Sequence, residues 1–236
     1  MKPIIKFNTI VLSLTTTAVF GIWLLISQLI LTYPDWFKEP SNDKYNLLGI
    51  IFMGLISIGV YRLVFLITSY FVNNCQWIKK QVFSSYYLEG TWVGFYIGVL
   101  GKVRYLIETF EQNIDGLVIK GTSYDENKNL HSFWTSESIN LDSEKGELSY
   151  QYKVRTTREK PDPNGIAYFS MIRENNRKPA SMLVGFSADS HLTKKCKAVE
   201  YRLNEKTNYD INKALKKAEE FYQTKKDIVF NYKESK

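Results

Sequence analysis

The sequence has few of the residues that build disulfide frameworks, metal centres and histidine-based active sites. Its 236 residues include only two cysteines, Cys75 and Cys196, and two histidines, His131 and His191. The cysteines lie far apart, which argues against a disulfide framework and fits a reducing compartment. Metal-ligand spacings, a Gly-rich phosphate loop and a nucleophile elbow are all missing. We therefore expect no metal, no cofactor and no enzymatic activity.

Paired carboxylates, which serve many hydrolases, are also not apparent. Glu108 and Glu111 are three residues apart, and in a strand this spacing places the two side chains on opposite faces. They are not expected to form a catalytic pair. We therefore expect the protein to act by binding a ligand and then rearranging.

Positive charge is scarce where a nucleic-acid polymer would need it. The net charge is +7, but Lys and Arg exceed Asp and Glu by four in residues 1–80, by two in 205–236 and by one in 81–204. A groove that follows a long phosphate backbone needs a more basic surface. We expect no DNA or RNA partner, whereas a small anion would need only a few local donors.

Charge is nearly absent from two long stretches in the first third of the chain. Residues 10–31 are predominantly apolar and long enough to cross a hydrocarbon layer of about 30 Å. A signal peptide is the alternative, since Lys2 and Lys6 precede the run, but the run is too long and no cleavage site follows. The second predicted span, 47–70, is interrupted only by Arg62. That residue either marks a functional site inside a bundle or, as we prefer, reaches the headgroups near the end of the span.

The charges that flank the two predicted spans set their orientation. Two spans put the N-terminus and everything after residue 80 on one side, and that side carries Lys2, Lys6, Lys79 and Lys80 near the membrane. The excess of basic residues predicts that this side is the cytoplasm. The domains expected are a membrane anchor (1–80), a soluble ligand-sensing domain (81–204) and a C-terminal helix with a tail (205–236).

From residue 86 onward the apolar pattern has a period of two, and turn-forming residues break it every 10 to 15 positions. Leu148, Tyr150, Tyr152 and Val154 are expected to face inward, with the intervening polar residues outward. No helix-length segment interrupts the pattern, which predicts an all-β, eight-stranded up-and-down antiparallel barrel without exposed edges. The expected strands are 86–98, 102–112, 115–124, 130–138, 147–156, 165–174, 180–188 and 195–204.

The two ends of this region have their own signals. Trp92 is expected to fill one end of the barrel, between Gly90 and Gly94, which let the backbone bend. After residue 205 the period becomes helical, and an amphipathic helix is predicted over 210–224, with N-cap residues Asn208 and Asp210. Its expected apolar face, which we expect to pack on protein, consists of Ile211, Leu215, Ala218 and Tyr222.

Two spans, a short basic connector, the segment Leu-Glu-Gly-Thr-Trp-Val-Gly (88–94) and a strand meander occur together in one known family. The later segments Leu-Val-Gly-Phe (183–186) and Glu-Tyr-Arg-Leu (200–203) also match it. In these features the chain resembles the two-transmembrane, β-strand-rich (β-barrel) effectors of bacterial CBASS anti-phage systems.

The resemblance implies a sequence of events as well as a fold. A partner nucleotidyltransferase makes a cyclic dinucleotide during phage infection, and the barrel binds it. The protein then forms a homo-oligomer, and the spans disrupt the bacterial inner membrane, killing the cell before phage release. The implied location is the inner membrane, multi-pass, with the N-terminus and the barrel in the cytoplasm.

A cyclic dinucleotide offers two bases to stack and two phosphates to neutralise, which aromatic rings and arginines suit. Alternatively, the aromatic residues form the barrel core and the arginines are solvated. The aromatic candidates for stacking, which have inward or ambiguous strand parity, are Tyr105, Trp134, Tyr152 and Tyr201. The other candidates are Arg104, Arg173 and Arg202 for phosphates, and Thr135 and Ser136 for base edges or ribose.

Two other functions are compatible with the same pattern. The aromatic-rich interior is also typical of a membrane-anchored, lipocalin-like carrier or binding module for a small hydrophobic ligand. A barrel filled by its own side chains would instead be a structural module that binds another protein. A cavity inside the barrel or at its mouth would separate the first two functions from the third.

Overall fold

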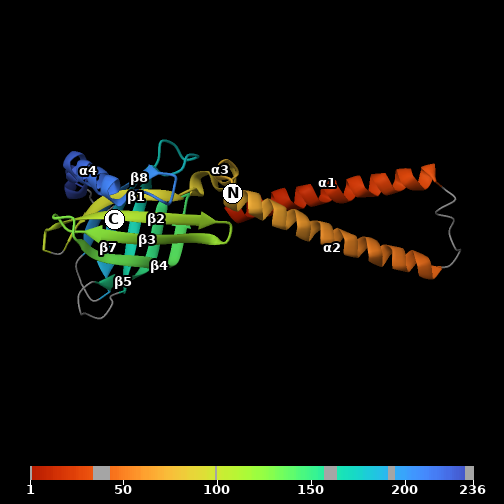
Figure 1. Ribbon diagram of the computed structural model, residues 1–236, viewed down its shortest axis with the longest axis horizontal. Helices are drawn as coiled ribbons and strands as arrows, with labels where there is room; N and C mark the ends of the chain where they lie inside the picture. Colours follow the sequence, from red (N-terminus) through yellow and green to blue (C-terminus); the bar gives the residue numbers. More distant parts are fainter. Residues whose placement is uncertain (1, 34–42, 99, 157–163, 191–194, 232–236) are drawn as a thin grey trace. The chain divides into compact units, whose positions relative to one another are not determined.

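The computed structural model describes residues 2–33, 43–98, 100–156, 164–190 and 195–231 (Figure 1). The chain divides into two compact units, Met1–Phe83 and Ser84–Lys236. The first unit is helical and the second contains the barrel. The boundary lies three residues after the one expected from the sequence, and the C-terminal helix belongs to the barrel unit.

The first unit consists of α1 (Pro3–Thr32), α2 (Asp43–Asn74) and the short α3 (Gln76–Phe83). The Phe7 ring near the start of α1 meets the Phe65 ring near the end of α2, with centroids 5.5 Å apart, so the two long helices run antiparallel. Two segments, Pro3–Thr32 and Met53–Asn74, are long and apolar enough to cross a membrane. α2 continues without a break through Arg62, beyond the predicted limit of residue 70.

Most of the described apolar side chains of α1 and α2 point away from both helices. Leu12, Leu25, Leu55 and Ile58 are each more than 60 % exposed. Exposed apolar surface of this extent is unfavourable in water and marks a membrane or protein contact. This pattern supports the prediction of a membrane anchor.

The second unit is a closed antiparallel barrel of eight strands in sequence order, as predicted, and β8 pairs with β1 to complete the ring. The strands are β1 (Gly90–Ile97), β2 (Val103–Asn113), β3 (Gly116–Tyr124), β4 (Leu130–Asp142), β5 (Glu147–Thr156), β6 (Asn164–Ile172), β7 (Met182–Asp189) and β8 (Cys196–Asn204). The first strand starts later than expected because Ser84–Tyr86 forms a 3-10 turn. The predicted alternation in β5 is confirmed, with Leu148, Tyr150, Tyr152 and Val154 all buried.

Helix α4 (Ile211–Asn231) packs on the outer face of β1, β2 and β8, and it runs seven residues beyond the predicted end. Asp210 begins it as expected: its carboxylate Oδ1 accepts a hydrogen bond from the Lys213 backbone N–H at 2.9 Å. The buried face comprises Ala214, Leu215, Ala218, Phe221 and Tyr222. Ile211 was expected on this face, but it is 54 % exposed in the first turn.

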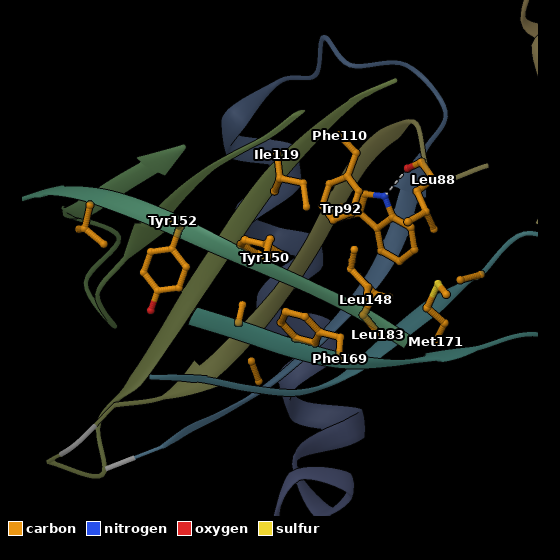
Figure 2. Close-up of a cluster of buried hydrophobic side chains, with 14 residues drawn as sticks. Leu88, Trp92, Phe110, Ile119, Leu148, Tyr150, Tyr152, Phe169, Met171 and Leu183 are labelled. Carbon is orange, nitrogen blue, oxygen red and sulfur yellow. Dashed lines mark hydrogen bonds between the residues drawn. The ribbon is translucent and has the colours of Figure 1, made fainter. Parts of the chain in front are cut away.

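The barrel unit therefore has two apolar cores. One lies inside the strands (Figure 2) and the other lies between the strands and α4. Because α4 covers the outside of β1, the inner residue Trp92 and the outer residue Phe95 are both fully buried. Strands covered on both faces lose the simple alternation of apolar and polar residues.

Candidate functional site

The interior of the barrel has a packed end and a hollow end. At the packed end Trp92 fills the barrel as predicted: its indole N–H donates to the Leu88 carbonyl at 2.9 Å, and its ring lies 5.2 Å from that of Phe110. Figure 2 shows these three side chains gathered at one end and Tyr152 toward the other. The residues that fill the packed end are Leu88, Trp92, Phe110, Ile119, Leu148, Met171 and Leu183.

The hollow end contains a cavity of about 140 Å³. It lies where β1 and β7 end and where β4 and β8 begin. Its lining residues are Tyr96, Leu106, Glu108, His131, Ser132, Trp134, Tyr150, Tyr152, Val154, Phe169, Ser187, Asp189, Cys196, Ala198 and Glu200. The described lining therefore has aromatic walls and three acidic residues, and it contains no lysine or arginine.

Two glycines determine where the aromatic walls lie. A Cβ on Gly121 would come within 2.2 Å of the Trp134 ring, and a Cβ on Gly165 within 2.3 Å of the Tyr152 ring. Each ring therefore lies against the bare backbone of the neighbouring strand, β3 or β6. Tyr150 completes the wall by stacking on Phe169, with centroids 6.3 Å apart.

Two carboxyl groups meet on the cavity wall, Glu108 from β2 and Glu200 from β8. Both residues are 1 % exposed. The strand between them, β1, contributes Gly94, which pairs with Leu106 on one side and Glu200 on the other. Gly94 has no side chain to separate the two acids, and a Cβ there would lie 2.1 Å from the Val199 carbonyl oxygen.

Glu108 is held by two donors. Its Oε1 accepts hydrogen bonds from the Trp134 indole N–H at 2.9 Å and the Tyr150 hydroxyl at 2.8 Å. The second oxygen, Oε2, is buried without a donor, and so is Oε2 of Glu200. Two ionised carboxylates in this position would repel each other strongly, so the pair is stable only if it keeps a proton.

The environment favours Glu200 as the carrier of that proton. Burial raises the pKa of both carboxyl groups. For Glu200 the charge of Glu108 and a hydrogen bond to it raise the pKa further, whereas for Glu108 the bonds from Glu200, Tyr150 and Trp134 oppose the rise. Glu200 is therefore the protonated donor and Glu108 the ionised acceptor. Burial also raises the pKa of Tyr150 well above its ordinary value, which keeps it a hydrogen-bond donor.

Hydrogen bonds between side chains border the mouth of the cavity. The Tyr152 hydroxyl donates to Asp189 Oδ1 at 3.0 Å, and the hydroxyls of Ser123 and Ser132 lie 2.7 Å apart. A shallow depression of about 420 Å³ lies on the far side of Tyr152 and shares Tyr152 and Asp189 with the cavity. The hydrogen bond between Tyr152 and Asp189 thus forms a partition that separates the cavity from the depression.

Of the nine residues predicted as candidates for ligand binding, Trp134 and Tyr152 line the cavity. Ser136 faces inward, but its hydroxyl accepts a hydrogen bond from the Ile119 backbone N–H at 2.9 Å and joins β3 to β4. Thr135, its neighbour, is exposed and lines an outer groove. The serine therefore has a structural partner, and the threonine is on the wrong face for a ligand inside the barrel.

Tyr105 and Tyr201, for which the sequence left an inward or ambiguous direction, face outward in the structure. Tyr105 lies against Tyr222 of α4, with ring centroids 6.3 Å apart, and Tyr201 against Phe221 at 4.4 Å. Both belong to the core outside the barrel. Because α4 covers the outer face of these strands, that face is apolar instead of polar. The alternation of apolar and polar residues therefore does not reveal which side chains face inward.

Arg173 and Arg202 lie at the packed end, away from the cavity. Arg202 Nη2 donates to the Tyr87 carbonyl at 2.6 Å, and its guanidinium lies 5.0 Å from the Trp92 ring. Arg173 Nη1 donates to the Ser143 carbonyl at 2.7 Å. Burial lowers the pKa of Arg202 to about 10. These two predicted phosphate partners instead cap the strands at the packed end.

Among the three predicted phosphate partners, Arg104 alone lies at the hollow end. It pairs with Tyr96 across β1 and β2. Burial raises the pKa of Tyr96, and the positive charge of Arg104 opposes that rise. Arg104 is therefore a cation near the mouth, although it does not line the cavity.

Sequence reasoning missed the acid pair. Glu108 has the parity of the buried residues Leu106 and Phe110, and this was a usable sign that it faces inward. Nothing in the sequence identified Glu200 as its partner, because β1 separates their strands. The prediction that Glu108 and Glu111 do not pair is confirmed, since Glu111 is exposed and pairs with Lys120 at 2.7 Å.

Within the described ranges, no three His, Cys, Asp or Glu side chains are grouped so that they could hold a metal ion, and His191 falls outside those ranges. The site is thus a small cavity with aromatic walls and a pair of carboxyl groups, which suits an organic ligand rather than a metal ion. No protein-family model, no curated protein and no solved structure matches the chain, so a function has to be argued from the geometry of this cavity.

Proposed function

We propose that the protein is a membrane-anchored receptor whose barrel binds a cyclic dinucleotide made by a partner nucleotidyltransferase. The observation that carries this proposal is the hollow end: a barrel with one end packed and the other open to a ring-sized ligand, in a chain with two apolar helices. The aromatic rings that line the cavity, among them Trp134, Tyr150 and Tyr152, suit a flat base. The protein acts by binding, and no catalytic step is required of it.

The size of the cavity limits how such a ligand sits. A volume of 140 Å³ is close to the roughly 150 Å³ of a cavity that holds one benzene ring. A whole cyclic dinucleotide is several times larger, so one base enters the cavity. The second base and the phosphates occupy the mouth and the depression beyond Tyr152, which requires the Tyr152–Asp189 hydrogen bond to open.

The charges of the site agree with this division. The cavity wall carries the buried pair Glu108 and Glu200, whose one negative charge repels phosphate, whereas Arg104 lies toward the mouth. A phosphate is therefore best accommodated outside the cavity. A carrier of purely apolar molecules, the alternative function, is less well supported because such a ligand would leave the unpaired carboxyl oxygens without donors.

In this proposal the barrel is the sensor and the helices are the effector. Two helices in one protomer cannot enclose a pore, so membrane disruption requires several copies to assemble after ligand binding. The location we propose is the bacterial inner membrane, with the N-terminus and the barrel in the cytoplasm. The outcome for the cell is abortive infection during anti-phage defence.

The full chain, reconstituted in lipid nanodiscs, is titrated calorimetrically with a panel of cyclic dinucleotides and, as control, with linear dinucleotides. We expect saturable binding of at least one cyclic compound. When that compound is added to dye-loaded liposomes that contain the protein, the dye should be released. No saturable binding by any member would refute the proposal.

A pair of variants tests whether the cavity is where binding occurs. Ser187 lines the mouth, whereas Ser149 lies on the outer face of β5. Ser187→Phe should abolish binding and dye release, and Ser149→Phe should leave both unchanged. Thermal unfolding of each variant establishes that the barrel is folded.

A further inference from the structure

Glu108 accepts hydrogen bonds from Trp134 and Tyr150, but the second carboxyl oxygen of Glu108 and that of Glu200 are buried without a donor. Burying two carboxyl groups is costly, and replacing buried charged groups with apolar ones is often neutral or stabilising. Both residues are 1 % exposed, and both line the cavity at the hollow end of the barrel. Buried ionisable groups in a cleft, each with a shifted pKa, are candidates for a functional role.

The pair presents one hydrogen-bond donor and one acceptor side by side. Glu108 Oε1 is already occupied by Trp134 and Tyr150, which fix the carboxylate in place. The oxygens left over are Oε2 of Glu108 and Oε2 of Glu200, neither of which has a donor from another residue. One proton between them makes one acid a donor and leaves the other an acceptor.

We propose that Glu108 and Glu200 read the hydrogen-bonding edge of the base that enters the cavity, and that they select bases with an amino group next to an unprotonated ring nitrogen. This inference rests on the proposed function for the class of ligand and adds the identity of its inserted base. On the edge used for base pairing, adenine and cytosine carry such a pair, whereas uracil has no amino group and guanine presents two adjacent donors, its ring N1–H and its amino group.

The chemistry of the contact follows from the protonation of the pair. When the base enters, the carboxyl O–H of Glu200 exchanges its hydrogen bond to Glu108 for one to the ring nitrogen, and the carboxylate of Glu108 accepts from the exocyclic amino group. Acidic side chains accept hydrogen bonds from the cytosine amino group in the same way in nucleic-acid complexes. Uracil would set a carbonyl oxygen against the Glu108 carboxylate, and that buried acceptor would lack a donor.

The test compares cyclic dinucleotides that share the phosphate ring and differ only in their bases: two adenines, two cytosines, two guanines or two uracils. The full chain in nanodiscs is titrated with each. We expect the adenine or cytosine compound to bind at least tenfold more tightly than the uracil compound. Equal affinities across the panel would overturn the inference.

Variants assign the preference to the two acids. Glu108→Ala removes the acceptor and Glu200→Ala removes the donor, so each should reduce the preference at least tenfold. Glu200→Gln retains an N–H donor and should restore most of it. Glu111→Ala, on the outer face of the same strand as Glu108, is the matched control and should change nothing. A uniform loss of affinity for every base in the first two variants would mean that the pair is only structural.

A second panel separates failure of this inference from failure of the proposed function. If no cyclic dinucleotide binds, the nucleosides adenosine, cytidine, guanosine and uridine are titrated at millimolar concentration. Binding of adenosine or cytidine that depends on Glu108 would keep base recognition and reject only the dinucleotide. Absence of any base preference in both panels would overturn the inference.

Discussion

The two ends of the barrel use the same eight strands for opposite purposes. At the packed end the inward side chains are large and apolar, and the polar groups present, such as Arg202, are bonded to backbone carbonyls. At the hollow end the rings stand apart around a cavity, and buried acids replace apolar side chains. The comparison indicates that one end stabilises the fold, whereas the other leaves a cavity that our proposal assigns to a ligand. Four predictions test this division.

The largest effect is expected from Trp92→Ala at the packed end. Trp92 is fully buried and contacts Phe110, so truncation should lower the free energy of unfolding by about 3–5 kcal/mol. Denaturant unfolding of the full chain measures the loss. The matched change at the hollow end, Tyr96→Phe, should cost less than about 1.5 kcal/mol, since it removes one weak hydrogen bond to Ser123. Similar losses at the two ends would contradict the division.

A smaller loss is expected from Gly121→Ala, which acts on the wall of the cavity. The new Cβ would collide with the Trp134 ring, displace it and weaken its bond to Glu108. Overpacking of this kind costs about 1–3 kcal/mol, and ligand affinity should fall as well. Gly116→Ala in the same strand has open space around it and is the control. Unchanged binding in Gly121→Ala would show that the position of Trp134 is unimportant.

The acid pair should make stability depend on pH. A carboxyl group whose pKa is raised on folding keeps its proton after the unfolded chain has lost it. The contribution of the pair to the free energy of unfolding should therefore be greatest below about pH 4.3, the pKa of a glutamate in the unfolded chain. Above that pH the free energy of unfolding should fall by about 1.4 kcal/mol per pH unit for each proton that the folded protein retains. The decline ends at the folded pKa. Urea unfolding between pH 5 and 8 measures this slope, and Glu200→Gln should flatten it. An equal slope in that variant would disprove the shared proton.

The smallest effect on stability is expected from Tyr152→Phe, which removes the hydrogen bond to Asp189 at 3.0 Å. The loss should be about 0.5–1.5 kcal/mol, but ligand should enter and leave faster because the partition between the two hollows is weakened. Stopped-flow fluorescence measures both rates. Asp189→Asn, alone and combined with Tyr152→Phe, completes a double-mutant cycle, and strictly additive effects would show that the bond does not form the partition.

Local patterns were enough to predict the barrel. Alternation in β5 and the helical period after Asp210 each depend on neighbours in sequence, and both were confirmed. Trp92 could also be placed, because a tryptophan between two glycines at the start of a strand has few alternatives to the barrel interior. The count and order of the strands followed from the spacing of turn residues.

The site was only partly predictable because it depends on contacts between distant segments. Tyr152 was found by its alternation, but Tyr105 was misassigned because α4 buries the outer face of β2 as well. The meeting of Glu108 with Glu200 requires the closure of β1 on β8 and a glycine at position 94. Neither condition can be read from the residues around either acid.

The pairing of β1 with β8, covered by α4, has a consequence for how the protein is made. The first strand of the barrel cannot find its last neighbour until about residue 204 has left the ribosome, and contacts so distant in sequence form slowly. Until then the edge of β1 that pairs with β8 has no partner, although both long apolar helices have already been synthesised. The nascent chain therefore passes through an interval in which its strands form an open sheet with an exposed edge.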